Sequence, residues 1–170
     1  MFVLLRPIRL FLRAMLTGST PSQMSLGLAC GVLLGLIPKG NLLAISLALL
    51  IAATRANLGV VAAAATICTY LANWIDPLSD RVGRFVLTLP SLQKFWTDVY
   101  NTPGMPWTDF NDSVVMGGLL IGLLLTGPLY FLTQSLFAEY MDIFAERAKT
   151  WRLSRWMLGA EWADRLGSVE

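Results

Sequence analysis

Long apolar runs, separated by short polar clusters, dominate this chain. Two runs of about a dozen residues, 24–37 and 42–53, flank the sequence Pro-Lys-Gly-Asn, and two longer runs cover 58–75 and 114–132. A helix that crosses a bilayer needs about 20 predominantly apolar residues. The pattern therefore predicts an all-α integral membrane protein in which the two longer runs are spanning helices.

The segment 24–53 is predicted to be a re-entrant helical hairpin, which enters the membrane and turns back at Pro38–Asn41. At about 1.5 Å per residue, 24–37 would cover roughly 21 Å of a hydrocarbon core that is roughly 30 Å thick. Non-helical backbone survives at such depth only where protein or a polar cavity surrounds it. Two tilted full spans, with the turn at the far interface, are the alternative interpretation.

Glycines at intervals of four residues indicate helix faces that can pack closely against another helix. Gly27, Gly31 and Gly35 follow this spacing in the first half of the hairpin, and Gly118 and Gly122 follow it in the last span. Both regions also contain a break made of glycine and proline. Broken helices in corresponding positions of two halves are typical of transporters, so the pattern gives weak support to that function class.

Three amphipathic segments are predicted to lie at the membrane surface. Residues 1–16 carry their arginines on one helical face, 76–113 are amphipathic and aromatic, and 133–158 combine an aromatic stripe with basic residues. Residues 159–170 are left as a tail. The span before 76–113 is expected to end at Asp76 and Pro77, because a carboxylate resists burial and proline breaks a helix.

Composition and charge support a single membrane domain over 1–170. Apolar residues make up 55% of the chain, charged residues only 14%, and the mean hydropathy is +0.60; soluble domains carry about 25% charge. Residues 1–75 contain five basic residues and no acidic one, whereas 76–113 contain three basic and five acidic residues. The positive-inside rule then places both termini in the cytoplasm of a bacterial inner membrane, with 76–113 outside.

Enzymatic chemistry is not expected from these residues. The chain has no histidine, which excludes a Ser-His-Asp or Cys-His arrangement, and its two cysteines, Cys30 and Cys68, are isolated in apolar runs. No phosphate-binding loop or metal-ligand spacing is present. No cofactor, metal or nucleic-acid partner is therefore expected.

Four polar residues near the hairpin are candidates for binding a lipid headgroup or an anion: Lys39, Asn41, Arg55 and Asn57. Charged groups within a membrane are costly and are usually functional, which favours Lys39. The structural alternative for Lys39 is a turn lysine that reaches toward the nearer interface. For Arg55 and Asn57 the structural alternative is a cytoplasmic anchor under the positive-inside rule.

Aromatic residues in 76–113 are candidates for contacting a partner: Trp96, Tyr100, Trp107 and Phe110. Aromatic side chains are frequent anchors of protein interfaces. The structural alternative is that they seat the segment flat on the outer leaflet.

Four stretches resemble, in order, a family of small bacterial inner-membrane proteins related to a larger group known only as a domain of unknown function: LGLACGVLLGLIPKGNLLAI, RANLG, NWIDPLSDRVG and YNTPGMPWTDFNDSVVMGG. The resemblance covers roughly residues 15–145. It implies no established enzymatic activity. It also implies a frequent gene neighbour that is similar to the AsmA-like periplasmic bridges, which are thought to carry phospholipid between membranes.

Two function classes follow. The first is a non-enzymatic inner-membrane component that supports phospholipid transport, with membrane lipids and a periplasmic AsmA-like protein as partners. The second is a small oligomeric transporter or channel for an anionic solute. Homo-oligomerisation stays open in both. A transporter should show a polar line through the bilayer, and 58–75 and 114–132 offer only threonine and one asparagine, so the first class is preferred.

Overall fold

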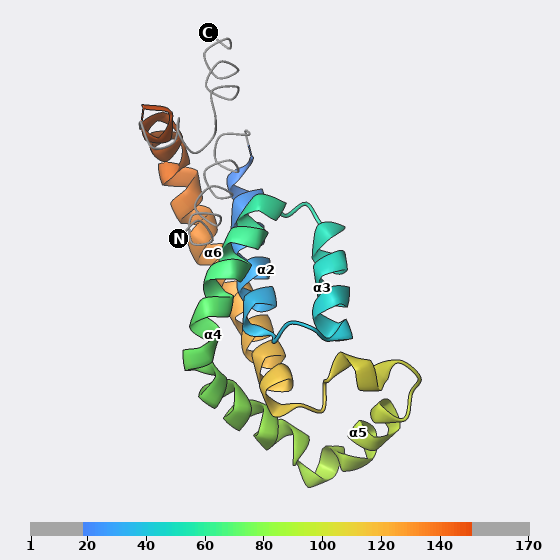
Figure 1. Ribbon diagram of the computed structural model, residues 1–170. Coiled ribbons are helices and arrows are strands. Elements are labelled where there is room, and N and C mark those ends of the chain that lie inside the picture. The colour runs from blue at the N-terminus through green and yellow to red at the C-terminus, as the bar shows by residue number, and fades with distance from the viewer. Residues whose placement is uncertain (1–18, 151–170) are drawn as a thin grey trace.

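The computed structural model describes residues 19–150 (Figure 1), so the predictions for 1–16, 151–158 and 159–170 lie outside the described residues. Every regular element in the described part is a helix, which confirms the all-α class. The elements are α2 (Pro21–Leu36), α3 (Leu42–Ala52), α4 (Leu58–Leu87), the 3₁₀ turn η2 (Pro90–Leu92), α5 (Gln93–Tyr100), the 3₁₀ turn η3 (Met105–Thr108) and α6 (Ser113–Thr150).

The core is a three-helix arrangement in which α2 packs against both α4 and α6. Helix α2 runs parallel to α4, because Gly27 lies beside Val60 and Gly35 lies beside Cys68. It runs antiparallel to α6, where Gly118 lies beside Leu36 and Ser22 shares a 3.0 Å hydroxyl–hydroxyl hydrogen bond with Tyr130. Fully buried side chains such as Met24 and Val60 fill the space between these helices.

Helices α2 and α3 form a hairpin whose two ends lie at the same end of the bundle (Figure 1). The amide of Asn57, just after α3, donates to the carbonyl of Gln23 in the first turn of α2 (3.0 Å). Between the helices, Gly40 adopts a φ of +107°, which glycine accepts without steric cost. A polar Thr-Pro start and a Pro-Lys-Gly-Asn turn thus bound the first helix on both sides.

Helix α4 continues through Pro77 to Leu87, so the expectation that Asp76 and Pro77 end this helix is wrong. Proline removes one backbone hydrogen bond, but Pro77 lies on an exposed face. Within the next two turns, Ser79 and Gly83 are buried against the start of α6. This packing holds the chain helical beyond the proline, because tertiary contacts routinely outweigh local propensity.

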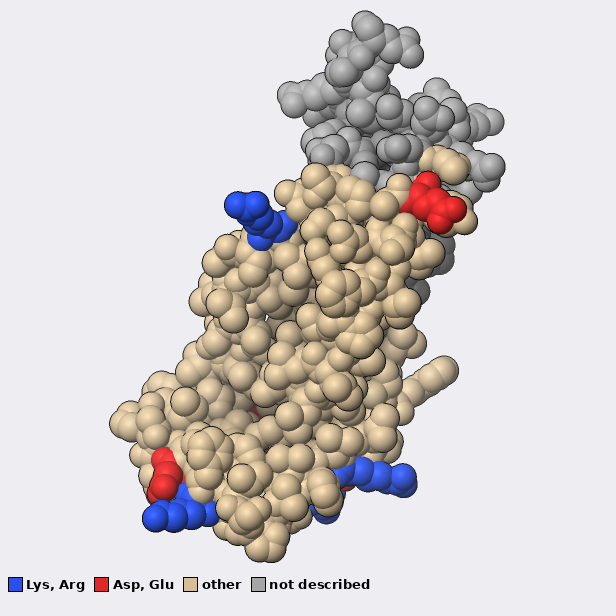
Figure 2. Space-filling model, turned by 180° about the vertical axis from the view of Figure 1, so that it is seen from behind, with Lys and Arg blue, Asp and Glu red and all other residues tan. Residues whose placement is uncertain are grey.

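Two helices are long and apolar enough to cross a membrane, Leu58–Leu87 and, within α6, Ser113–Tyr140. Helix α6 itself is continuous to Thr150 and includes Pro128, so the predicted span 114–132 and the start of 133–158 belong to one helix. In Figure 2, charged side chains gather at the two ends of the face shown, with a wide uncharged band between them. Both features are typical of a membrane protein.

The predicted periplasmic segment folds beneath the hairpin turn (Figure 1). Its aromatic residues form a cluster, with ring centroids 6.0 Å apart for Trp96 and Phe110 and 6.3 Å apart for Tyr100 and Phe110. The indole N–H of Trp96 donates to the carbonyl of Val86 (3.2 Å), which fastens α5 to the end of α4. The segment is therefore a folded cap rather than an extended loop.

Candidate functional site

An open hollow of about 920 Å³ lies where the hairpin turn meets the cap, and is called the tip hollow here. Three separate parts of the chain line it: the hairpin turn, the end of α4, and the segment 109–115, which leads into α6. Its charged lining residues are Lys39, Arg84, Asp109 and Asp112. The site thus brings two cations and two carboxylates together at one end of the bundle.

Lys39 neutralises the carboxyl end of α2. Its ammonium group donates to the carbonyl oxygens of Leu34 (2.5 Å) and Ile37 (2.6 Å), and more weakly to that of Gly35 (3.4 Å). The last carbonyls of a helix have no partner within the helix, and a cation is favoured there. The side chain is nevertheless exposed, so its charge also faces the hollow.

Lys39 also lines a second hollow of about 340 Å³ along α4, called the α4 hollow here. The remaining lining residues are Ala62, Ala65, Thr66, Thr69 and Tyr70. Lys39 therefore lies at the boundary between a charged hollow and a mostly apolar one.

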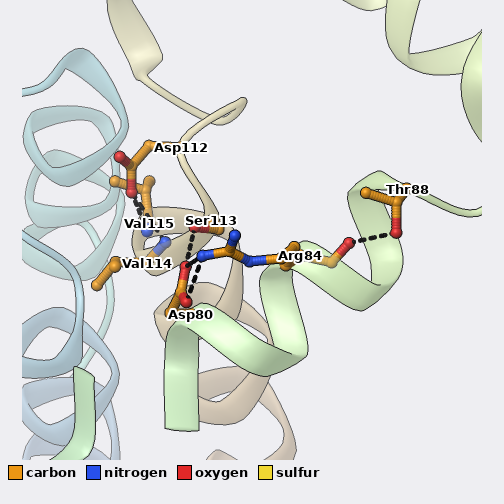
Figure 3. Close-up of polar contacts among 7 residues, drawn as sticks. All are labelled: Asp80, Arg84, Thr88, Asp112, Ser113, Val114 and Val115. Carbon is orange, nitrogen blue, oxygen red and sulfur yellow. Dashed lines mark hydrogen bonds and ion pairs between the residues drawn. The ribbon is translucent and has the colours of Figure 1, made fainter. Parts of the chain in front are cut away.

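Arg84 and Asp112 are already engaged in contacts that fix the geometry of the tip hollow (Figure 3). The guanidinium of Arg84 binds both carboxylate oxygens of Asp80, at 2.8 and 2.6 Å, and Asp80 also accepts a hydrogen bond from the hydroxyl of Ser113. Asp112 accepts from the first amides of α6, including that of Val114 at 2.8 Å. The contact between Asp80 and Ser113 joins the last third of α4 to the first residue of α6.

Asp109 differs from the other charged residues of the hollow. Its carboxylate makes no hydrogen bond or ion pair to any described residue, and it adopts a φ of +52°, the left-handed region that aspartate and asparagine tolerate best. Within residues 19–150 it is the non-glycine residue with positive φ. Such positions concentrate at functional sites.

The other predicted binding residues have visible structural roles or lie apart. Asn41 is buried and caps α3 by accepting from the amide of Ala44 (2.8 Å), although it also lines the tip hollow. Asn57 caps α4 by accepting from the amide of Val60 (3.1 Å). Arg55 is exposed at the opposite end of the hairpin from Lys39. The structure therefore brings together Lys39 and Asn41 but not Arg55 or Asn57.

The glycines predicted to allow close packing all lie at helix contacts. A Cβ atom on Gly27, Gly31 or Gly35 would meet α4, and one on Gly118 or Gly122 would meet α2. A Cβ on Gly31, for example, would lie 2.7 Å from the carbonyl oxygen of Val61.

The predicted partner residues divide into two kinds. Phe110 is only 7% exposed and forms the centre of the aromatic cluster, so it supports the cap. Trp107 is 77% exposed and is available to a partner. Trp96 and Tyr100 both pack against Phe110, but Trp96 is half-buried whereas Tyr100 is 45% exposed.

A polar stripe along α4 was missed from the sequence. Its residues recur at intervals of three or four and so share one helical face: Thr66, Thr69, Asn73, Asp76, Asp80 and Arg84. The first two line the α4 hollow and the last lines the tip hollow. The periodicity is visible in the sequence, but a helix that ends at Pro77 divides the stripe between two elements, whereas the continuous helix α4 keeps it on one face.

The fold defines an all-helical protein with two helices able to cross a membrane. More particularly, the chain belongs to the family described as an uncharacterized protein conserved in bacteria (DUF2062), whose model matches residues 5–143. It is similar to an uncharacterized protein of Treponema pallidum (strain Nichols), with 24% identity over 137 residues, which cover 81% of this chain and 85% of the relative. No solved structure matches.

Proposed function

We propose that this protein is a non-enzymatic component of the bacterial inner membrane that supports phospholipid transport between membranes. In this proposal its partner is a periplasmic AsmA-like bridge protein. The observation that carries the proposal is the hairpin of α2 and α3, whose charged turn opens into a hollow beside a folded cap. A lipid-handling component needs such a place, where headgroup chemistry is available next to an apolar surface.

The dimensions of the hairpin support a re-entrant position. Helices of 16 and 11 residues reach roughly 24 and 17 Å, both short of a hydrocarbon core of roughly 30 Å. Along α4, the last turn of α2 at Gly35 is level with Thr69, which lies roughly 17 Å along that helix from Leu58. Along α6, the turn is level with Gly118, close to the start of that helix. These levels favour a turn that lies past the membrane centre and is covered by the cap.

The cap faces the periplasm in this proposal, and both termini face the cytoplasm. Support comes from the charge distribution, because the residues before α4 are basic without acidic ones, while 76–113 contain five acidic residues against three basic ones. The turn that points toward the cap would then open to the side on which a bridge protein collects lipid.

Trp107 is the residue best placed to contact that bridge protein. Changing Phe110 as well would disturb the buried aromatic cluster, so Trp107→Ala alone is the clean variant. The matched control is Trp74→Ala, because Trp74 is 85% exposed but lies on α4. We expect the AsmA-like protein to co-purify in mild detergent with the wild type and with Trp74→Ala, and to be lost with Trp107→Ala.

Two outcomes would contradict the proposal. If the wild type recovers no AsmA-like protein under conditions that preserve membrane complexes, the proposed partner is wrong. If Trp107→Ala keeps the partner as well as the control does, the cap surface at Trp107 is not the contact.

The alternative function, a small oligomeric transporter or channel for an anionic solute, gains support from the polar stripe of α4. The stripe supplies more polar side chains along the helix than 58–75 alone suggested. Its carboxylates, Asp76 and Asp80, oppose an anionic solute, which leaves the lipid-related function preferred. Uptake of a radiolabelled inorganic anion into proteoliposomes would favour the alternative.

A further inference from the structure

We propose that the tip hollow binds the headgroup of a zwitterionic phospholipid, with its phosphate at Lys39 and its ammonium group at Asp109. One acyl chain would lie along the α4 hollow. This inference deepens the proposed function and rests on it for the class of ligand. It assigns a binding site that combines the hairpin turn with the segment before α6.

The charges of the tip hollow select a zwitterion. Arg84 is paired with Asp80, and Asp112 already caps α6, so Lys39 and Asp109 are the charged lining residues that have neither an ion-pair partner among the described residues nor a capping role at α6. An anionic headgroup would gain the first interaction but would be repelled by the second. A headgroup that carries both charges matches both, and such complementarity gives specificity.

The hydrogen bonds of Lys39 leave room for a phosphate. Two of its three contacts with the end of α2 are short, whereas the 3.4 Å contact with Gly35 is near the limit of a hydrogen bond. A phosphate oxygen could replace this weak contact while the two short contacts keep the side chain in place. The new bond would join two charged groups and would therefore be stronger than the long contact with a neutral carbonyl that it replaces.

The boundary position of Lys39 indicates a lipid rather than a soluble phosphate compound. The same side chain lines a charged hollow and a mostly apolar hollow. A soluble zwitterion such as phosphoethanolamine would use only the first hollow. A phospholipid would use both, because its polar head and its acyl chains join at the glycerol.

The conformation of Asp109 allows a clean test of the ammonium contact. Asparagine tolerates the left-handed region as well as aspartate does, so Asp109→Asn removes the charge without a new backbone cost. Asp98→Asn is the matched control, since Asp98 is an exposed residue of α5 outside the lining. For the phosphate contact, Lys39→Gln keeps a side-chain donor for the carbonyls of α2, and Lys94→Gln is its control.

The experiment is native mass spectrometry of the full-length protein, released from detergent that contains equal amounts of phosphatidylethanolamine and phosphatidylglycerol. We expect the wild type to retain phosphatidylethanolamine about tenfold better, the factor that one charge-assisted contact supplies. Asp109→Asn should abolish this preference while lipid is still retained. Lys39→Gln should lower retention of both lipids, and Lys39→Arg should restore it. Both controls should behave as the wild type.

Other outcomes would overturn the inference. Equal retention of the two lipids by the wild type, or an unchanged preference in Asp109→Asn, would exclude the zwitterion site. Displacement of lipid by millimolar inorganic phosphate would assign the hollow to a free anion. Thermal unfolding of each variant in detergent separates lost binding from lost folding, because Asp109→Asn should unfold at the wild-type temperature. A wild type that shows the lipid selectivity but recovers no AsmA-like protein would contradict the proposed function alone.

Discussion

At the scale of single residues, two neighbouring glycines of α6 allow close contact with two different helices. Gly117 faces α4, where an added Cβ would collide with the carbonyl of Ser79, and Gly118 faces α2, where it would lie 2.5 Å from the carbonyl oxygen of Leu36. The four-residue spacing predicted Gly118 and Gly122 as packing residues. It could not reveal Gly83 or Gly117. These two glycines meet where α4 crosses α6, and neither belongs to a series of glycines spaced four residues apart.

Gly117→Ala is expected to lower the free energy of unfolding by about 1–3 kcal/mol, the typical cost of an overpacked contact. The new methyl group would meet backbone, which cannot rotate away. The measurement is thermal unfolding of the purified protein in detergent. Gly127→Ala is the matched control, because it lies in the same helix with nothing within 4 Å of its added Cβ. Equal destabilisation of both variants would show that the α4–α6 crossing is looser than described.

At the scale of elements, local signals predicted the two short helices and the turn between them correctly, and one helix end wrongly. Asn41 and Asn57 stand at helix starts, as asparagine prefers, and the Pro-Lys-Gly-Asn turn separates two helices as its residues predict. Pro77 led to the wrong helix end because the cost of a proline within a helix, the loss of a backbone hydrogen bond, can be recognised from the local sequence alone. The compensating burial of Ser79 and Gly83 depends on α6, which lies more than thirty residues later in the chain.

Asn57→Ala is expected to destabilise the protein by about 1 kcal/mol through loss of the cap of α4. The side chain accepts from the amide of Val60 and donates to the hydroxyl of Ser19 (2.5 Å), so it joins two helix starts. Chemical denaturation in detergent measures the change, with the exposed Asn101, which lies outside the tip hollow, changed to alanine as the comparison. If Asn57→Ala instead left stability unchanged but weakened lipid retention, its sequence-based role in headgroup binding would replace the structural one.

At the scale of the whole molecule, the hydrophobic pattern predicts the order of the helices along the chain, but it does not predict which residues line the tip hollow. Lys39 was a candidate because a charge stands out in an apolar run. Its neighbours in the tip hollow, Arg84 and Asp109, come from segments about 45 and 70 residues away. The packing of α4 and α6 against α2 places both residues beside the turn. Topology, which single-sequence patterns specify weakly, creates the site.

The direct test of the re-entrant hairpin is the depth profile of α3. Single cysteines at Leu42, Ile45, Leu49 and Ala53, in a protein with Cys30 and Cys68 changed to alanine, would carry nitroxide labels on the exposed side of the hairpin. In proteoliposomes, the ratio of oxygen to nickel-chelate accessibility reports the depth of each label. A re-entrant hairpin predicts that depth increases from Ala53 and is greatest for the labels at Ile45 and Leu42, which lie near the membrane centre. A maximum near the middle of α3, with Leu42 back at interfacial depth, would contradict it and establish a full span.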